Sequence, residues 1–189
     1  MNQTDFAGRE RLIAMLDDAV RTGDDATAVS AVRRGLESLA REGAIELSEE
    51  IRRPLPDHYA RRLLYRSEDL GYTVIAMTWG PEQETPLHDH AGLWCVDGVW
   101  SGRLEVVQYE LLEERDERFR FEPRDTIHAG AGSAGSLIPP YEYHTIANAQ
   151  DTPSVTVHVY AGDMERCSIF LPEGEGWYRR EEKRLRFDA

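Results

Sequence analysis

The sequence has few cysteines and no long hydrophobic run. Cys95 and Cys167 are the only two cysteines in 189 residues, too few for a disulfide-stapled extracellular domain. No apolar stretch approaches the ~20 residues that a membrane helix needs. The opening residues MNQTDFAGRERL contain no apolar signal-peptide core. We therefore expect a cytoplasmic protein that has no membrane partner.

Positive charge is also scarce. The chain has 35 Asp and Glu against 22 Lys and Arg, a formal net charge of −13. Nucleic acids and anionic membranes attract basic surfaces, so this balance argues against both as partners. With 41% hydrophobic and 30% charged residues, the composition is that of an ordinary globular protein. The length suffices for one domain with a buried core, and the oligomeric state stays open.

The first fifty residues show helical periodicity. Apolar residues recur near a 3.6 period in two successive segments, the second of which stops at Gly43 (Leu12, Met15, Leu16, Val20; Val29, Val32, Leu36, Leu39). We expect residues 1–52 to form a helical segment that packs on the rest of the chain.

From about residue 59 the pattern changes to short β-rich runs. Gly, Pro, Asp and Asn turns separate these runs, among them YTVIAMTW, RLEVVQYEL and SVTVHVYAG. No long helical pattern lies between them, which argues against parallel βαβ units and favours an antiparallel sandwich or barrel. Residues 53–189 are therefore expected to form a β-barrel, and the whole chain one structural domain.

Two histidines stand one residue apart in TPLHDHAGLWC. If this run is a strand, His88 and His90 share one face and Asp89 lies on the other. Two imidazoles on one face are either a surface feature or half of a metal site.

A second group of polar residues lies downstream. His144 follows a Pro-Pro turn, and SVTVHVY alternates strictly, with valines on one face and Thr156, His158 and Tyr160 on the other. A row of polar side chains opposite valines indicates that the polar face looks into a wet or metal-lined cavity.

Taken together, these motifs resemble the two-block signature of cupins, which are small double-sheet β-barrels. Within the cupins they resemble the cysteine dioxygenase type I family of thiol dioxygenases, over roughly residues 55 to 170. That family has His-x-His, a cysteine five residues on and a glycine seven beyond it, and later a histidine followed at four residues by asparagine. The matching residues here are His88, His90, Cys95, Gly102, His144 and Asn148, with Gly80 preceding them.

The resemblance implies a cupin barrel with N-terminal helices and a role for each matching residue. It implies that Fe(II) is bound by His88, His90 and His144. It implies a catalytic row of Thr156, His158 and Tyr160, and a possible thioether crosslink between Cys95 and Tyr160. The Tyr-x-Arg segment that holds the substrate in the family is matched by Tyr59 and Arg61.

The sequence also departs from the family in several places. The acid that many cupins carry as a fourth ligand is absent, and Cys95 occupies that region as it does in the family. Thr156 stands for the usual serine and keeps a hydroxyl, and Ala161-Gly162 replace the prolines of the animal enzymes. Related bacterial enzymes that prefer other thiols tend to carry Gln where this chain has Arg61.

Three neutral imidazoles would leave a ferrous ion its full charge and up to three open positions, which favours an anionic thiolate. We expect an iron-dependent dioxygenase that adds both atoms of O2 to a small thiol carboxylate. L-cysteine, oxidised to cysteine sulfinic acid, is the first choice because Arg61 and Cys95 both match the cysteine-using branch. A dioxygenase for 3-mercaptopropionate or another thiol carboxylate is one alternative. A non-catalytic cupin that binds a metal or a small acid is the other.

The remaining conspicuous residues receive structural interpretations. We expect Arg62 to be the exposed member of the arginine pair, Cys167 to be a core residue, and His58 and His128 to lie on the surface. The tryptophans are expected in the core or the wall of the pocket (Trp79, Trp94, Trp100).

Overall fold

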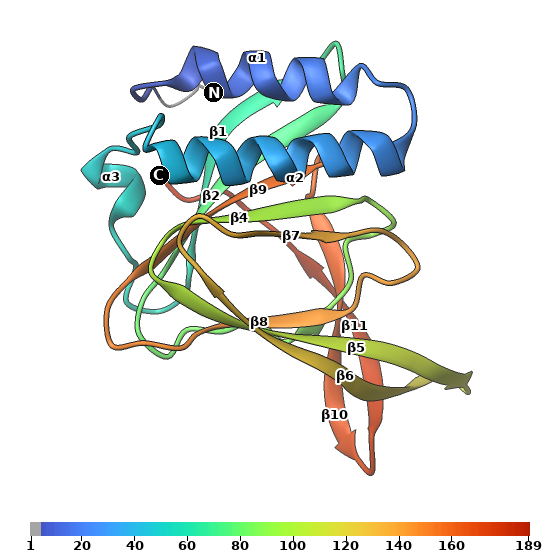
Figure 1. Ribbon diagram of the computed structural model, residues 1–189. Helices are drawn as coiled ribbons and strands as arrows, with labels where there is room; N and C mark the ends of the chain where they lie inside the picture. The colour runs from blue at the N-terminus through green and yellow to red at the C-terminus, as the bar shows by residue number, and fades with distance from the viewer. Residues whose placement is uncertain (1–4) are drawn as a thin grey trace.

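The computed structural model describes residues 5–189 and lays a helical layer over one face of a β-barrel (Figure 1). The helices come first: α1 (Arg9–Val20), α2 (Asp25–Glu42) and the short α3 (Glu49–Arg52). The strands follow as β1 (Ala60–Ser67), β2 (Tyr72–Trp79), β3 (Leu87–His88), β4 (Cys95–Ser101), β5 (Arg103–Arg115), β6 (Arg118–Gly130), β7 (Ala134–Leu137), β8 (His144–Asn148), β9 (Ser154–Tyr160), β10 (Arg166–Gly174) and β11 (Trp177–Arg184).

The strands form two facing antiparallel sheets. One sheet has the order β1-β2-β9-β4-β7, and the other closes on itself in the order β10-β11-β6-β5-β8-β3. The β5–β6 and β10–β11 hairpins extend beyond the barrel on the side away from the helices (Figure 1). This double-stranded β-helix with N-terminal helices confirms the expected cupin fold.

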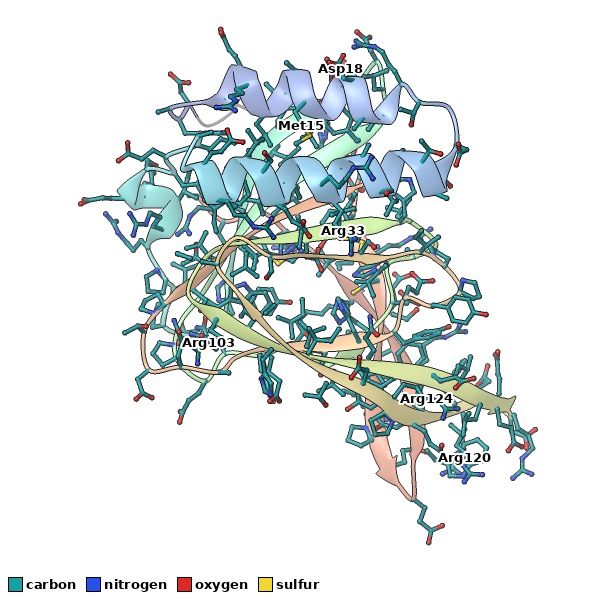
Figure 2. The ribbon with its side chains drawn as sticks, viewed as in Figure 1. Met15, Asp18, Arg33, Arg103, Arg120 and Arg124 are labelled. Atoms are coloured by element: carbon teal, nitrogen blue, oxygen red, sulfur yellow. The ribbon has the colours of Figure 1, made fainter. Side chains whose placement is uncertain are left out.

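The ends of the second helix follow from its sequence. Asp24 caps α2 by accepting a hydrogen bond from the Thr27 amide at 2.9 Å, and Gly43 ends the helix in the left-handed region at φ 61°. Met15 of α1 lies between the two long helices (Figure 2), where a Cβ on Gly35 would meet its sulfur at 2.1 Å. Gly35 therefore lets α1 and α2 pack closely. No helix among residues 5–189 is long and apolar enough to cross a membrane.

The five-stranded sheet is buried on both faces. Val155, Val157 and Val159 of β9 join the core beneath the helices, with Leu16 and Leu36. The residues that alternate with these valines point into the barrel, as the sequence pattern predicted. The site is therefore built on the inner face of a sheet whose outer face is held rigid by packing.

One prediction about this sheet is wrong. Arg62 was expected to be exposed, but it is only 6% exposed and donates from Nη1 to the Ile51 carbonyl at 2.9 Å. Successive residues of β1 point to opposite faces, so Arg61 faces the barrel and Arg62 faces α3. Because α3 covers that outer face, both arginines are buried.

Candidate metal centre

Three histidines converge inside the barrel. His88 of β3 is paired with His144 of β8, and their Nε2 atoms lie 3.2 Å apart. The ring of His90 lies 5.3 Å from that of His88 and 5.0 Å from that of His144, centroid to centroid. One ring nitrogen from each of the three lies within 4.8 Å of the others. The fold thus brings together the three histidines that the sequence singled out.

The route by which His90 reaches the cavity differs from the expected one. Strand β3 ends at His88, so the run is not a strand as far as His90, and the condition for the two histidines to share one strand face is not met. His90 lies in the turn that follows, where Glu142 accepts a hydrogen bond from its amide at 2.8 Å. The Asp89 carboxylate accepts from the Ser168 amide at 2.8 Å, which ties the turn to β10.

The protonation of this cluster suits a metal ion. Burial lowers the pKa of His90 to about 3 and lowers the pKa of His88 and His144 as well, so all three rings are neutral at pH 7. His88 donates its Nδ1 proton to the Pro86 carbonyl at 3.0 Å, which leaves the lone pair on Nε2. Two nitrogens bound at right angles to one ion at ~2.1 Å would lie about 3 Å apart, close to the 3.2 Å between the Nε2 atoms of His88 and His144. The residues therefore fit a divalent transition metal.

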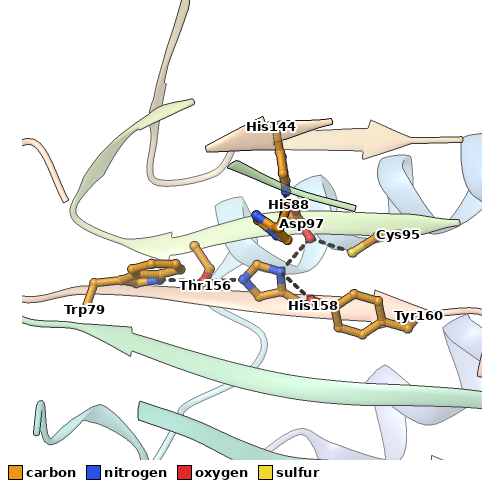
Figure 3. Close-up of polar contacts among 8 residues, drawn as sticks. All are labelled: Trp79, His88, Cys95, Asp97, His144, Thr156, His158 and Tyr160. Atoms are coloured by element: carbon orange, nitrogen blue, oxygen red, sulfur yellow. Dashed lines mark hydrogen bonds and ion pairs between the residues drawn. The ribbon is translucent and has the colours of Figure 1, made fainter. Parts of the chain in front are cut away.

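Next to this cluster runs the polar row of β9 (Figure 3). Thr156 Oγ1 and His158 Nε2 lie 2.7 Å apart, and the indole of Trp79 donates to Thr156 Oγ1 at 2.9 Å. The Tyr160 hydroxyl is 3.5 Å from His158 Nδ1. Trp79, which the sequence placed only in the core or the wall, is thus the first donor of the row.

The sequence interpretation overlooked Asp97. Its carboxylate Oδ1 lies 2.6 Å from His158 Nδ1 and 2.8 Å from Cys95 Sγ (Figure 3). Burial by itself would raise the pKa of Asp97, but His158, His144 and His90 hold it well below its usual range. An acid therefore does stand near the histidines, two residues after the position of the usual cupin ligand. The signal was available, because Cys95 and Asp97 share one face of a strand.

The hydrogen bonds at the two ends of the row have a fixed direction. An indole nitrogen only donates, so Thr156 accepts from Trp79, and its hydroxyl lies 2.7 Å from His158 Nε2. The Asp97 carboxylate only accepts, so His158 Nδ1 carries a proton and donates it to Asp97. A donating Nδ1 cannot accept from Tyr160, and the Tyr160 hydroxyl is hydrogen-bonded instead to Cys95.

Cys95 is paired directly with Tyr160 across β4 and β9, as Asp97 is with His158. Its thiol is free and buried. Burial first, and then the charge of Asp97, raise the pKa of the Cys95 thiol well above its ordinary value. Burial likewise raises the pKa of Tyr160. Both groups are protonated at neutral pH.

All three histidines open onto one narrow cavity. Tyr59, Arg61, His158, Tyr160 and Cys167 are among the residues that line it. Its volume is about 30 Å³, room for only a few water-sized groups. A wider cavity of about 410 Å³ meets His144 and His158 from another direction, and Asp97 and Thr156 line this one.

The predicted substrate residues lie in the narrow cavity, but Arg61 has internal partners. It donates from Nη1 to the Arg186 carbonyl at 3.2 Å and from Nη2 to the Met164 carbonyl at 3.3 Å. Tyr59 stacks on Trp79 with ring centroids 4.6 Å apart. The C-terminal segment after β11 therefore closes over Arg61.

Other residues of the predicted motif support the fold around the site. Asn148 donates to the Gly80 and Thr152 carbonyls, both at 2.9 Å, and accepts from Ser154 Oγ at 2.8 Å. Gly102 adopts a φ of 84°, where a Cβ would meet Ser154 Oγ at 2.2 Å. Asn148 and Gly102 thus fix the loops between strands. His58 and His128 are exposed, in contact with Asp188 and Glu105, and Cys167 is buried, as expected.

Comparisons with solved structures give low identities. TT1209 from Thermus thermophilus matches at 19% identity over 62% of this chain and 96% of that chain, with a TM-score of 0.48. An uncharacterized conserved protein with a double-stranded β-helix domain from Klebsiella pneumoniae matches at 21% identity over 63% of this chain and 91% of that chain, with a TM-score of 0.46. An oxalate oxidase in complex with the substrate analogue glycolate matches at 19% identity over 57% and 53% of the two chains, with a TM-score of 0.45.

A comparison with family models covers most of the chain. The model described as cysteine dioxygenase type I matches residues 11–172, a range that includes the three histidines, Cys95, Asp97 and the whole of β9. The chain therefore belongs to the cysteine dioxygenase type I family.

Proposed function

We propose that the protein is a non-haem Fe(II) thiol dioxygenase that converts R–SH and O2 into the sulfinic acid R–SO2H. Both oxygen atoms enter the product, so the equation balances without another reductant. The observation that carries the proposal is the buried cluster of three neutral histidines in a chain of this family.

His88, His90 and His144 would hold the iron, which when bound supplies the redox centre at which the thiol and dioxygen meet. The chain's own residues then position the substrate. The Arg61 guanidinium puts a fixed positive charge in the cavity for a substrate carboxylate. The Tyr160 ring lies beside the histidines, with its centroid 5.8 Å from that of the His90 ring.

The row behind Tyr160 holds these groups in place. Trp79, Thr156, His158 and Asp97 form consecutive hydrogen bonds of 2.6 to 2.9 Å. Partners on both ring nitrogens hold the His158 ring in one orientation, with Nδ1 donating to Asp97. Tyr160 is kept protonated by its burial, and its hydroxyl is hydrogen-bonded to Cys95.

L-cysteine is our first choice of substrate because Arg61 is present. A second candidate, 3-mercaptopropionate, is favoured by a specific feature of the cavity. No Asp or Glu occurs among the described residues that line it, so the ammonium group of cysteine would find no acidic partner there. The ratio of kcat/KM for the two thiols decides between them.

We also propose that Cys95 and Tyr160 can form a thioether. The step breaks the S–H bond of Cys95 and one aromatic C–H bond of Tyr160 and joins Sγ to that carbon, and the two protons and two electrons released reduce dioxygen to hydrogen peroxide. The direct pairing of the two residues across β4 and β9 supports this. Intact mass after turnover measures it: a loss of two hydrogens in the wild type, absent in Cys95→Ala, is expected. A fully active enzyme with unchanged mass would refute the crosslink.

Oxygen uptake by the Fe(II)-loaded protein tests the function. We expect thiol-dependent uptake with one O2 consumed per sulfinate formed. His88→Ala should lose both iron and uptake, and the surface variant His128→Ala should keep both. Iron retained without uptake for any small thiol carboxylate would favour a non-catalytic cupin instead.

A further inference from the structure

The chain has a single lysine, and it lines the cavity of the candidate metal centre. Lys183 is the only lysine among 22 basic residues. It lies on β11 directly opposite Cys167 of β10, and both side chains line the cavity that holds the three histidines. Its neighbours Glu182 and Arg184 point outward and are exposed, as the alternation of a strand requires. Lys183 lies beyond residue 172, where the family match ends.

The ammonium group of Lys183 has no anionic partner among residues 5–189. Its one described contact is a cation–π contact, with Nζ 6.0 Å from the centre of the Tyr59 ring. Tyr59 is itself fixed by stacking on Trp79. The carboxylate of Asp97 lines the other cavity and is satisfied by His158 and Cys95. The ammonium donors of Lys183 therefore remain available inside the cavity.

Arg61 is less available than its position suggests. Both of its terminal nitrogens donate to main-chain carbonyls, those of Arg186 and Met164. Its carbon Cζ lies 5.6 Å from the centre of the Phe187 ring. The guanidinium thus contributes charge to the cavity but has already used part of its hydrogen-bonding capacity. Lys183 brings a second charge whose hydrogen-bonding capacity is unused.

We propose that Lys183 binds the anionic group of the substrate and determines specificity together with Arg61. The substrate class is a short thiol that carries a carboxylate and no obligatory ammonium group, since two cations and no acid line the cavity. The thiol part of this assignment rests on the proposed function. The role of Lys183 as an anion-binding group does not need turnover.

Steady-state kinetics on four proteins test the role of the charge. Lys183→Met removes the charge and keeps the length, and Lys183→Arg keeps the charge. Arg166→Met is the matched control, because Arg166 is an exposed cation on the neighbouring strand that pairs with Glu182. For Lys183→Met we expect KM for 3-mercaptopropionate to rise ~10- to 100-fold, the range for a lost charge-assisted hydrogen bond, with kcat close to wild type. KM for cysteamine, which has no carboxylate, should stay unchanged in every variant.

A labelling experiment gives an answer that does not depend on turnover or on the folding of a variant. An amine-reactive N-hydroxysuccinimide ester can modify only Lys183 and the N-terminal amine, and mass spectrometry separates the two. Under nitrogen, 3-mercaptopropionate should protect Lys183 in the Fe(II)-loaded wild type, while 2-mercaptoethanol, a thiol with neither a carboxylate nor an amine, should not. The N-terminal amine serves as the internal control.

The outcomes separate this proposal from the proposed function. The role of Lys183 is overturned if Lys183→Met leaves KM for carboxylate thiols unchanged, or if it raises KM for cysteamine by the same factor. Either result counts even if the enzyme is an active thiol dioxygenase. If no thiol is oxidised, the dioxygenase proposal fails, and the labelling experiment alone tests whether Lys183 binds an anion. Protection by the carboxylate thiol then still supports an anion site at Lys183, and equal labelling with and without it overturns that site.

Discussion

Replacing Asp97 tests the hydrogen-bonded row behind the candidate metal centre. The carboxylate is only 17% exposed and accepts from His158 Nδ1 at 2.6 Å and from Cys95 Sγ at 2.8 Å. Asp97→Leu removes both acceptors, whereas Asp97→Asn keeps an oxygen acceptor and loses the charge. The pair of variants therefore separates the hydrogen bond from the charge.

The expected magnitudes follow from the buried donors. Leaving the Nδ1–H of His158 without an acceptor costs ~1–3 kcal/mol of unfolding free energy, and the thiol adds less because it is a weak donor. Without Asp97, the Nε2–H tautomer of His158 competes, since Thr156 can accept instead of donating. Loss of such a positioning partner lowers activity by ~10- to 100-fold. We expect this loss in Asp97→Leu and a smaller one in Asp97→Asn.

Stability also depends on pH through this residue. The folded pKa of Asp97 lies below the unfolded value of about 3.9, so its stabilisation is present above that pH and is lost as the pH falls toward the folded pKa. In the metal-free protein, the wild type should have a higher free energy of unfolding than Asp97→Asn, and this difference should narrow as the pH is lowered below ~3.9. Urea unfolding at several pH values measures it. A difference in unfolding free energy that stays constant with pH would contradict the assignment of a negative charge to folded Asp97.

Imidazole ¹⁵N NMR gives the decisive readout. The wild type should show His158 protonated on Nδ1, with the resonance assigned by its loss in His158→Gln, and Asp97→Leu should show a mixture of tautomers. The control is Asp17→Asn, which weakens a carboxylate bond to the Tyr72 hydroxyl of 2.7 Å outside the cavity. An Nε2–H tautomer in the wild type, or one unchanged in Asp97→Leu, would refute the reasoning.

Three further predictions concern single residues. Gly102→Ala should lose at least ~1 kcal/mol in urea unfolding, because its φ is 84° and its Cβ would lie 2.2 Å from Ser154 Oγ. Gly71→Ala, also at positive φ but with open space around it, should lose less, and equal losses would contradict the close contact. Thr156→Ser should keep most of the rate of oxygen uptake, and in Thr156→Val that rate should fall ~10- to 100-fold. Similar rates in the two variants would show that the Thr156 hydroxyl does not contribute to activity. Asp188→Ala should speed hydrogen exchange of the Arg61 amide, which donates to Asp188 at 2.8 Å, and unchanged protection would mean that the C-terminal segment does not cover it.

Much of the site could be predicted because its signals are local. The alternation in β9 placed Thr156, His158 and Tyr160 on one face, since a strand with a period of two leaves no other arrangement once the valines are buried. The spacing of His88, His90 and Cys95 matched a family pattern, which the family comparison supports. The helices were predicted from their periodicity, and α2 ends at Gly43 as expected.

Asp97 shows where local reasoning was insufficient. Its position on a strand placed its side chain on the same face as Cys95, but its importance depends on which strand lies opposite. Only the β4–β9 register puts Asp97 across from His158 and Cys95 across from Tyr160. The burial of Arg62 is similar, because it depends on α3 covering the outer face of β1.

The sequence by itself determined the fold class and the candidate metal ligands, because hydrophobic periodicity and motif spacing are properties of short segments. The tertiary structure alone decided that Asp97 completes the row, that Arg61 is held by the C-terminal segment and that Lys183 enters the cavity. These arrangements join residues far apart in the chain, such as Arg61 and Arg186, 125 positions apart. Strand register and barrel closure set such contacts, and both depend on the packing of the whole chain.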